Sequence, residues 1–92
     1  MYVILVYDIC GEQNGQKVLN KTFKTCKKYL THVQKSVFEG TISEAQLIKL
    51  KHELEMVLRK DIDSVLVFTS RNERWLDKQF WAKEDDLTSN FL

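Results

Sequence analysis

The sequence predicts a small α+β domain, and three observations support this fold class. The chain opens with six apolar residues, 2–7, which lack helical periodicity and so predict a strand buried on both faces. Two later segments, 14–29 and 43–60, have the periodicity of amphipathic helices, and strand-like segments follow each of them. The 92 residues suffice for one modest core, and a hydrophobic content of 43% argues against wholesale disorder.

The opening strand is expected at the centre of its sheet, because an edge strand would expose one of its apolar faces. It ends at Asp8, where an open sheet usually presents functional groups. An aspartate here more often caps a turn through its own backbone, so the local pattern leaves a functional role for Asp8 open. The loop over residues 9–15 is not a phosphate-binding loop, because it lacks the required glycine spacing and the Lys-Ser/Thr ending.

The first helix is predicted to begin near Asn14, a residue suited to capping, and to run to about Tyr29. Its apolar side carries Leu19, Phe23, Cys26 and Leu30. Four lysines fall within an arc of about 60° on the other side. This lysine stripe consists of Lys17, Lys21, Lys24 and Lys28. It is either an ordinary solvated face or a surface that follows a phosphate backbone. The second alternative is favoured by the repulsion between the lysines, which no acidic residue of the helix offsets.

Two short strands are predicted next, over residues 30–34 and 37–42, with a bend between them. Gly40 suggests a bulge or a close approach of another backbone. His32 has no partner at metal-ligand spacing, so a structural role is expected. Ser43 and Gln46 then form a capping box that opens the second helix, which 61–63 should break.

The segment 64–69 is apolar enough to predict a fourth strand in the interior of the sheet. The order strand, helix, strand, strand, helix, strand is that of the ferredoxin-like βαββαβ sandwich. In that fold both helices cover one face of a four-stranded antiparallel sheet, and the first strand is central. Residues 1–70 are therefore expected to form a ferredoxin-like core.

Residues 71–92 have no place in this core and are expected to make dimer and partner contacts. Both tryptophans, Trp75 and Trp81, lie in a segment that a monomer would expose. We expect this segment to be a fifth strand added to the sheet of a partner subunit. The end of the chain, from Lys83 on, is predicted to be an acidic, weakly ordered tail.

Charge and cysteine usage narrow the functional classes. Residues 1–60 carry ten Lys and Arg against six Asp and Glu, a net charge of +4, whereas residues 61–92 carry −3, from four against seven. A local basic face is therefore compatible with a net charge of only +1. Cys10 and Cys26 lack metal-site spacing and fit free thiols in a cytoplasmic protein. The opening strand lacks a basic leader and is too short to span a bilayer, so we expect neither a signal peptide nor a membrane partner.

Two motifs carry a resemblance to a known family. One is the apolar strand that ends in Tyr7-Asp8-Ile9. The other is the run 34–40, Gln-Lys-Ser-Val-Phe-Glu-Gly, which matches a Gln-x-Ser-Val-Phe-x-Gly pattern after the first helix. Over roughly residues 1–69 the chain resembles the CRISPR-associated protein 2 family of small adaptation proteins. The resemblance implies a ferredoxin-like protomer in a two-fold homodimer, with a C-terminal strand joining the partner's sheet.

The resemblance also implies a role for Asp8 as a catalytic and metal-binding residue. In family members described as nucleases, this aspartate and its symmetry mate hold a divalent metal, here expected to be Mg²⁺ at the dimer axis. Two carboxylates make a better site than one, because Mg²⁺ takes several oxygen ligands. Such a metal can acidify a bound water and stabilise a phosphorane-like transition state. Ser36 and Phe38 either line this site or hold the bend and the core.

Two functions remain open at this point. The first is a dimer that binds duplex DNA through the lysine stripe, without sequence preference, and bridges the integrase, CRISPR-associated protein 1, during spacer acquisition in antiviral defence. The second is a Mg²⁺-dependent endonuclease that acts on single-stranded RNA or duplex DNA through paired Asp8. Family members often have arginines soon after the aspartate and at the position of His32. This chain lacks them, so fewer guanidinium groups can hold a phosphate near Asp8, and this argues against the nuclease function. A ferredoxin-like interaction or small-molecule module is the third interpretation, which the two motifs disfavour.

Overall fold

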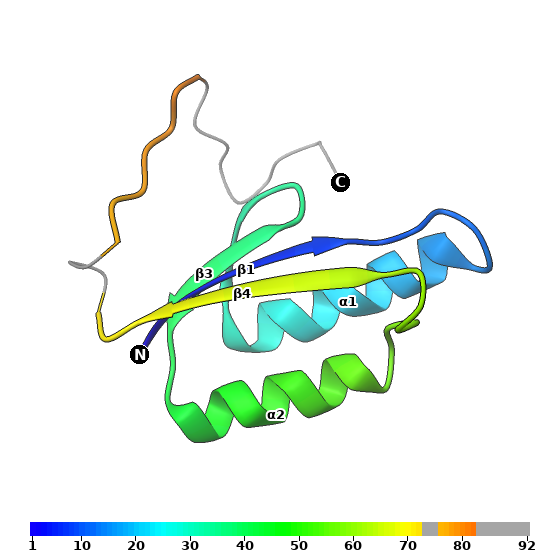
Figure 1. Cartoon of the computed structure of the whole chain (residues 1–92), viewed down its shortest axis with the longest axis horizontal. Coiled ribbons are helices and arrows are strands. Elements are labelled where there is room, and N and C mark those ends of the chain that lie inside the picture. Colours follow the sequence, from blue (N-terminus) through cyan, green and yellow to red (C-terminus); the bar gives the residue numbers. More distant parts are fainter. Residues whose placement is uncertain (73–75, 83–92) are drawn as a thin grey trace.

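The computed structural model of the chain is a four-stranded antiparallel sheet with two helices packed on one face (Figure 1). The structure describes residues 1–72 and 76–82. The elements are β1 (Tyr2–Asp8), α1 (Gly15–Tyr29), β2 (Thr31–Gln34), β3 (Val37–Thr41), α2 (Glu44–Glu55) and β4 (Ser64–Ser70). The strand order is β2-β3-β1-β4, which is the ferredoxin-like order and confirms the predicted fold class.

β1 lies inside the sheet, as its composition predicted. It pairs antiparallel with β3 on one side and with β4 on the other. Alternate residues of a strand point to opposite faces, and the odd-numbered residues of β1 point to the helices. The core consists of Val3, Leu5, Tyr7, Cys26, Leu30, Phe38, Ile42, Leu50 and Leu54. The even-numbered residues of β1 therefore lie on the other face of the sheet, which the helices do not cover.

α1 has the predicted bounds and Asn14 is its N-cap residue, but Asn14 does not cap the helix through its side chain. Asn14 adopts a left-handed backbone conformation, with φ 67°, and its side chain makes no capping hydrogen bond. The start of the helix is packed instead of capped, because Gly15 is buried against the preceding loop. A Cβ at Gly15 would lie 2.2 Å from the carbonyl oxygen of Cys10, so only glycine fits there.

The β2–β3 ribbon is bulged, though not at Gly40. The register shift lies in β2, between His32 and Gln34. Gly40 instead allows a close approach, since an added Cβ would lie 3.1 Å from Cδ2 of Leu30. His32 is buried, and its Nε2 donates a hydrogen bond to the carbonyl oxygen of Lys35 at 2.8 Å. The predicted structural role of His32 is therefore confirmed.

α2 begins with the predicted capping box. The Ser43 hydroxyl accepts a hydrogen bond from the Gln46 N–H at 3.1 Å, and the Gln46 side chain accepts one from the Ser43 N–H at 3.0 Å. The regular helix ends at Glu55, earlier than expected, and hydrogen-bonded turns carry the chain on to β4. Neither helix of the described residues is long and apolar enough to cross a membrane.

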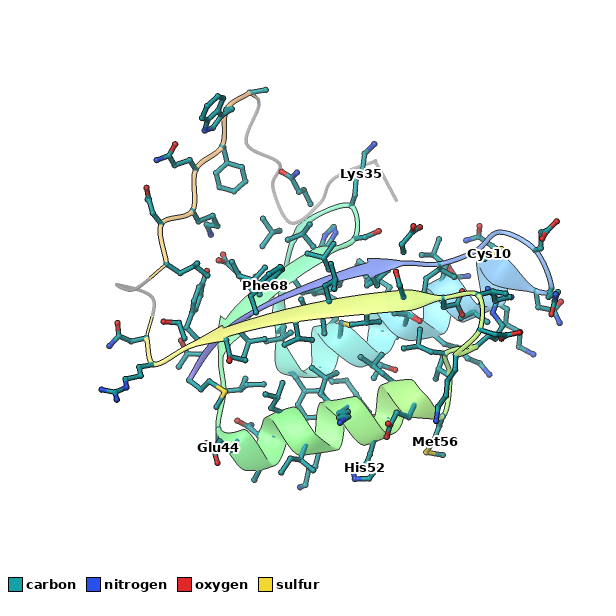
Figure 2. The ribbon with its side chains drawn as sticks, in the orientation of Figure 1. Cys10, Lys35, Glu44, His52, Met56 and Phe68 are labelled. Carbon is teal, nitrogen blue, oxygen red and sulfur yellow. The ribbon has the colours of Figure 1, made fainter. Side chains whose placement is uncertain are left out.

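β4 is an edge strand, so its predicted interior position is wrong for the single chain. Within the described residues it pairs only with β1, and Leu66 and Phe68 are 60% and 54% exposed. Both lie on the side of the sheet away from the helices (Figure 2, Phe68) because they pair with Val6 and Ile4. We call this surface the open sheet face, formed by Ile4, Val6, Val37, Leu66 and Phe68.

The described part of the C-terminal segment, residues 76–82, contains no strand. It passes on the side of the sheet opposite the helices (Figure 1) and contacts β3, where the ammonium of Lys78 pairs with the carboxylate of Glu39. Trp81 is 92% exposed in this arrangement. The fifth strand on a partner subunit stays a prediction, and both Trp75 and the acidic tail from residue 83 lie outside the described residues.

Candidate functional site

Asp8 lies at the end of β1. It is exposed and pairs with Ser64 of β4, and it points to the side of the open sheet face because Tyr7 points to the core. Among residues 1–72 and 76–82, no three or more His, Cys, Asp or Glu side chains gather where they could hold a metal ion. One carboxylate does not meet the oxygen-rich coordination that Mg²⁺ requires. The described residues of a single chain therefore do not fit the implied metal, and a second Asp8 would have to come from another copy.

The two residues expected to line this site have different positions. The carbonyl oxygen of Ser36 accepts a hydrogen bond from the N–H of Tyr7 at 3.1 Å, which places Ser36 one residue away from Asp8. Phe38 is fully buried, and its ring packs 5.4 Å from that of Phe23 and 6.0 Å from that of Tyr7, centroid to centroid. Phe38 is thus a core residue, whereas Ser36 holds the end of β1 through its backbone.

Tyr7 cannot act as a general base here. Burial, and to a smaller extent the neighbouring thiol of Cys26, raise the pKa of Tyr7 to about 12. Its hydroxyl therefore stays protonated at any physiological pH and can serve as a hydrogen-bond donor. Burial likewise raises the pKa of Cys26 to about 12, so this thiol is an inert part of the core.

An ion pair that the sequence analysis missed lies beside the loop after Asp8. The Arg59 Nε donates to Asp63 Oδ2 at 2.9 Å, and its Nη2 donates to Asp63 Oδ1 at 2.8 Å. The carboxylate of Asp63 is completely buried. The side-chain hydrogen bonds from Arg59 hold the pKa of this carboxyl well below its usual range, despite the opposing effect of burial. We call Arg59 and Asp63 the loop clamp.

The loop clamp binds the loop through its backbone. The N–H of Cys10 donates to Asp63 Oδ1 at 2.9 Å, and the carbonyl oxygen of Cys10 accepts from Arg59 Nη2 at 2.7 Å. Arg59 Nη1 donates to the carbonyl oxygens of Glu12 and Gln13. Charge-assisted bonds of this kind are about twice as strong as neutral ones. The loop that leaves Asp8 is thereby fixed to the turn before β4. The i,i+4 spacing of Arg59 and Asp63 was the only signal of the pair in the sequence.

The lysine stripe lies on the solvent side of α1, with all four side chains exposed. Lys28 pairs with the carboxylate of Glu53 on α2, and this hydrogen bond raises the pKa of Lys28 and lowers that of Glu53. No ion pair within the described part of the chain involves the other three lysines. The structure does not bring the stripe together with Asp8, because the stripe lies in the helix layer and Asp8 on the opposite face of the sheet.

Comparison with known proteins gives consistent matches. The family model described as "CRISPR associated protein Cas2" matches residues 1–78. A relative from Fusobacterium nucleatum, named CRISPR-associated endoribonuclease Cas2, is 47% identical over 92 residues, which cover 100% of this chain and 87% of the relative. A second relative, named CRISPR-associated endoribonuclease Cas2 2, from Moorella thermoacetica, is 43% identical over 91 residues, which cover 98% of this chain and 100% of the relative.

Solved structures agree with the sequence matches. The crystal structure of Streptococcus pyogenes Cas2 at pH 6.5 superposes with a TM-score of 0.72 at 30% identity, covering 87% of this chain and 100% of that one. A second Cas2 crystal structure gives a TM-score of 0.78 at 36% identity, covering 91% and 88% of the two chains. The similarity therefore extends to both the sequence and the fold.

Proposed function

This chain belongs to the Cas2 family of CRISPR systems, and from that premise we propose that it acts as a two-fold homodimer that binds duplex DNA during spacer acquisition. The observation that carries this proposal is the open sheet face. Leu66 and Phe68 are more than half exposed there, beside Ile4 and Val6 of β1. A contiguous apolar surface of this kind on a soluble domain usually marks an interface. The occupant we propose is the same face of a second copy.

The edge of β4 gives this dimer a second contact. An apolar groove of about 400 Å³ lies between α2 and β4, with Leu50, Leu54, Val65 and Val67 in its lining. The C-terminal segment of the second copy adds to β4 as a fifth strand and brings its aromatic residues to this groove. Strand addition of this type takes its affinity from main-chain hydrogen bonds and its specificity from side-chain pockets. The 92% exposure of Trp81 in the single chain supports this exchange.

The lysine stripe supplies the DNA contacts in this proposal. Lys17, Lys21 and Lys24 bind phosphates, and Lys28 contributes less because Glu53 already neutralises it. Each duplex phosphate contact adds about 0.9 to the slope of log affinity against log salt concentration. These contacts carry no base information, so binding is non-specific. In the acquisition complex the dimer bridges copies of the integrase, CRISPR-associated protein 1.

The test is a double charge reversal, Lys17→Glu with Lys21→Glu. Duplex DNA affinity should fall, and the salt slope should decrease by about 1.8 for two lost contacts. The matched control is Lys49→Glu with Lys60→Glu, which makes the same change of charge at two exposed positions off the stripe. If both variants lost the same affinity for duplex DNA, the effect would come from net charge and not from the position of the lysines. If the stripe variant kept its affinity, the lysine stripe would not bind DNA.

A second candidate activity is metal-dependent cleavage of a phosphodiester, which the exposed position of Asp8 favours. In a dimer whose two-fold axis passes near the end of β1, the two Asp8 carboxylates would together hold one Mg²⁺. The metal, when bound, would acidify a water and offset charge on the phosphate. Asp8 would hold this metal, and the Ser36 carbonyl and the loop clamp hold the backbone on either side of Asp8.

This candidate is tested with Asp8→Asn, an isosteric change that removes the charge. Mg²⁺-dependent cutting of single-stranded RNA or duplex DNA should disappear, while light scattering still shows a dimer. A control with Asp61→Asn changes a carboxylate outside the site, which is also exposed. Cutting that persists in Asp8→Asn, or that continues in EDTA, would place the chemistry elsewhere.

A further inference from the structure

A second groove opens between α1 and the β2–β3 turn, at the end of the sheet that carries Asp8. Its volume is about 290 Å³. This is just below the range for ligand pockets, about 300–1,000 Å³, so the groove suits a ligand of about one ring system. The side chains that matter for binding are those of Tyr7, Gln16, Asn20, Phe23, Lys24 and Lys35.

The groove lies on the helix side of the same end of β1 that carries Asp8. Tyr7 lines it and immediately precedes Asp8, and Ser36 lines it and holds the N–H of Tyr7. Because Tyr7 and Asp8 point to opposite sides of β1, the groove and the carboxylate lie on either side of the end of this one strand. Lys35 stands on the turn between β2 and β3 (Figure 2).

An aromatic ring held in place forms one wall of the groove. Phe23 packs edge-on against His32, with ring centroids 5.0 Å apart, and against Phe38 at 5.4 Å. These two contacts fix the orientation of a ring that still lines the groove. Proteins that bind single strands use such fixed aromatic rings as stacking platforms for bases.

Polar groups complete the groove. The amides of Gln16 and Asn20 hydrogen-bond to each other, Nε2 to Oδ1 at 3.1 Å, which leaves one carbonyl oxygen and one NH₂ group on this pair. The hydroxyl of Tyr7 makes no hydrogen bond to any residue that the structure describes. Amide pairs and hydroxyls of this kind recognise the edges of bases, and the ammonium of Lys24 suits a phosphate.

We propose that this groove binds one unpaired nucleobase of a single-stranded nucleic acid, with Lys24 on the adjoining phosphate. A base inside a duplex cannot enter, because its faces are stacked and its edge is paired. The groove therefore favours single strands, which the lysine stripe cannot do, since phosphate contacts are common to single strands and duplexes. The proposal rests on the nucleic-acid binding proposed above and adds to it a choice of substrate.

The test fills the groove with Asn20→Trp, at an exposed position of α1 where a larger side chain does not disturb the core. His52→Trp adds the same side chain at an exposed position of α2 and is the control. The probes are a short single strand carrying one 2-aminopurine, the same strand with an abasic site, and its duplex. We expect Asn20→Trp to weaken single-strand binding about tenfold, with duplex binding unchanged. Wild type should quench 2-aminopurine, and it should bind the abasic strand less tightly.

A second variant, Gln16→Ala with Asn20→Ala, removes the amides without filling the groove and should also weaken single-strand binding alone. The groove would not be a base-binding site if a variant lost equal affinity for single strands and duplex, or if Asn20→Trp still quenched 2-aminopurine fluorescence. The stripe variant separates the two proposals. If Lys17→Glu with Lys21→Glu weakens binding and Asn20→Trp does not, only the groove fails. If no variant or wild type binds either probe, nucleic-acid binding fails with it.

Discussion

Replacing Gly15 by alanine should destabilise the protein, because Gly15 packs against the loop that follows Asp8. An added Cβ would lie 2.2 Å from the carbonyl oxygen of Cys10 and 3.1 Å from its carbon. Both atoms belong to the backbone, so a rotamer change cannot relieve the overlap. The loop can yield only by moving the Cys10 carbonyl, which Arg59 Nη2 holds at 2.7 Å.

The size of the loss follows from two opposing effects. Alanine is favoured over glycine inside a helix by up to about 1 kcal/mol, and by less in the first turn, where Gly15 lies. Forcing a methyl group into a packed site costs about 1–3 kcal/mol, and weakening a hydrogen bond to a charged group adds about 1.5 kcal/mol or more. The free energy of unfolding should therefore fall by about 2–4 kcal/mol. For a domain of this size even the lower value lowers Tm by about 8–16 °C.

Urea unfolding followed by circular dichroism measures this loss, and Gly11→Ala is the matched control. Gly11 lies in the same loop, and a Cβ there would meet nothing within 4 Å. Gly11→Ala should therefore stay within about 0.5 kcal/mol of wild type. If Gly15→Ala were as stable as Gly11→Ala, the loop would not be packed against Gly15 and held by Arg59 as described.

Three further predictions concern single side chains. Because the pKa of Asp63 is lowered in the folded state, its contribution to stability is present above its ordinary unfolded value of about 3.9 and is lost as pH falls towards the folded pKa. Asp63→Asn should therefore flatten the acid limb of the stability–pH curve, and an acid limb as steep as that of wild type in urea titrations from about pH 6 to 3 would contradict this. Lys28→Gln should reduce duplex affinity less than Lys21→Gln, because Lys28 already pairs with Glu53 and is less available to a phosphate, and anisotropy titrations showing equal losses would count against that pairing. Phe38→Ala should cost about 3–5 kcal/mol of unfolding free energy, while Phe38→Leu keeps both fold and nucleic-acid binding, and loss of binding in a stably folded Phe38→Leu would return this residue to the site.

Most of the fold was predictable because it follows from local patterns. β1 is apolar on both faces, which predicted its central position in the sheet, and the Ser43–Gln46 capping box predicted the start of α2. β4 was predicted in the interior of the sheet but lies at its edge. Its apolar composition indicates that the strand is suited to burial, but it does not indicate which partner would bury it. Leu66 and Phe68 are 60% and 54% exposed.

The site was less predictable because it depends on contacts between distant residues. The loop clamp joins Asp63 to Cys10 across 53 positions, and no periodicity reports such a contact. The same holds for Lys28, whose partner Glu53 lies on the other helix. Asn14 has the residue type of a cap, yet the packing of the next residue, Gly15, decided the geometry there. Asp8 was singled out from its position at the end of a strand, and it is exposed, with no group of three or more metal-ligating side chains at hand among the described residues.

The most direct test of the proposed function is the mass of the protein by light scattering after gel filtration, with labelled duplex DNA present at low and at high salt. A DNA-binding dimer should elute as a particle of two chains that carries DNA at low salt and releases it at high salt. A particle of one chain, or a dimer that elutes without DNA at low salt, would contradict the proposed function.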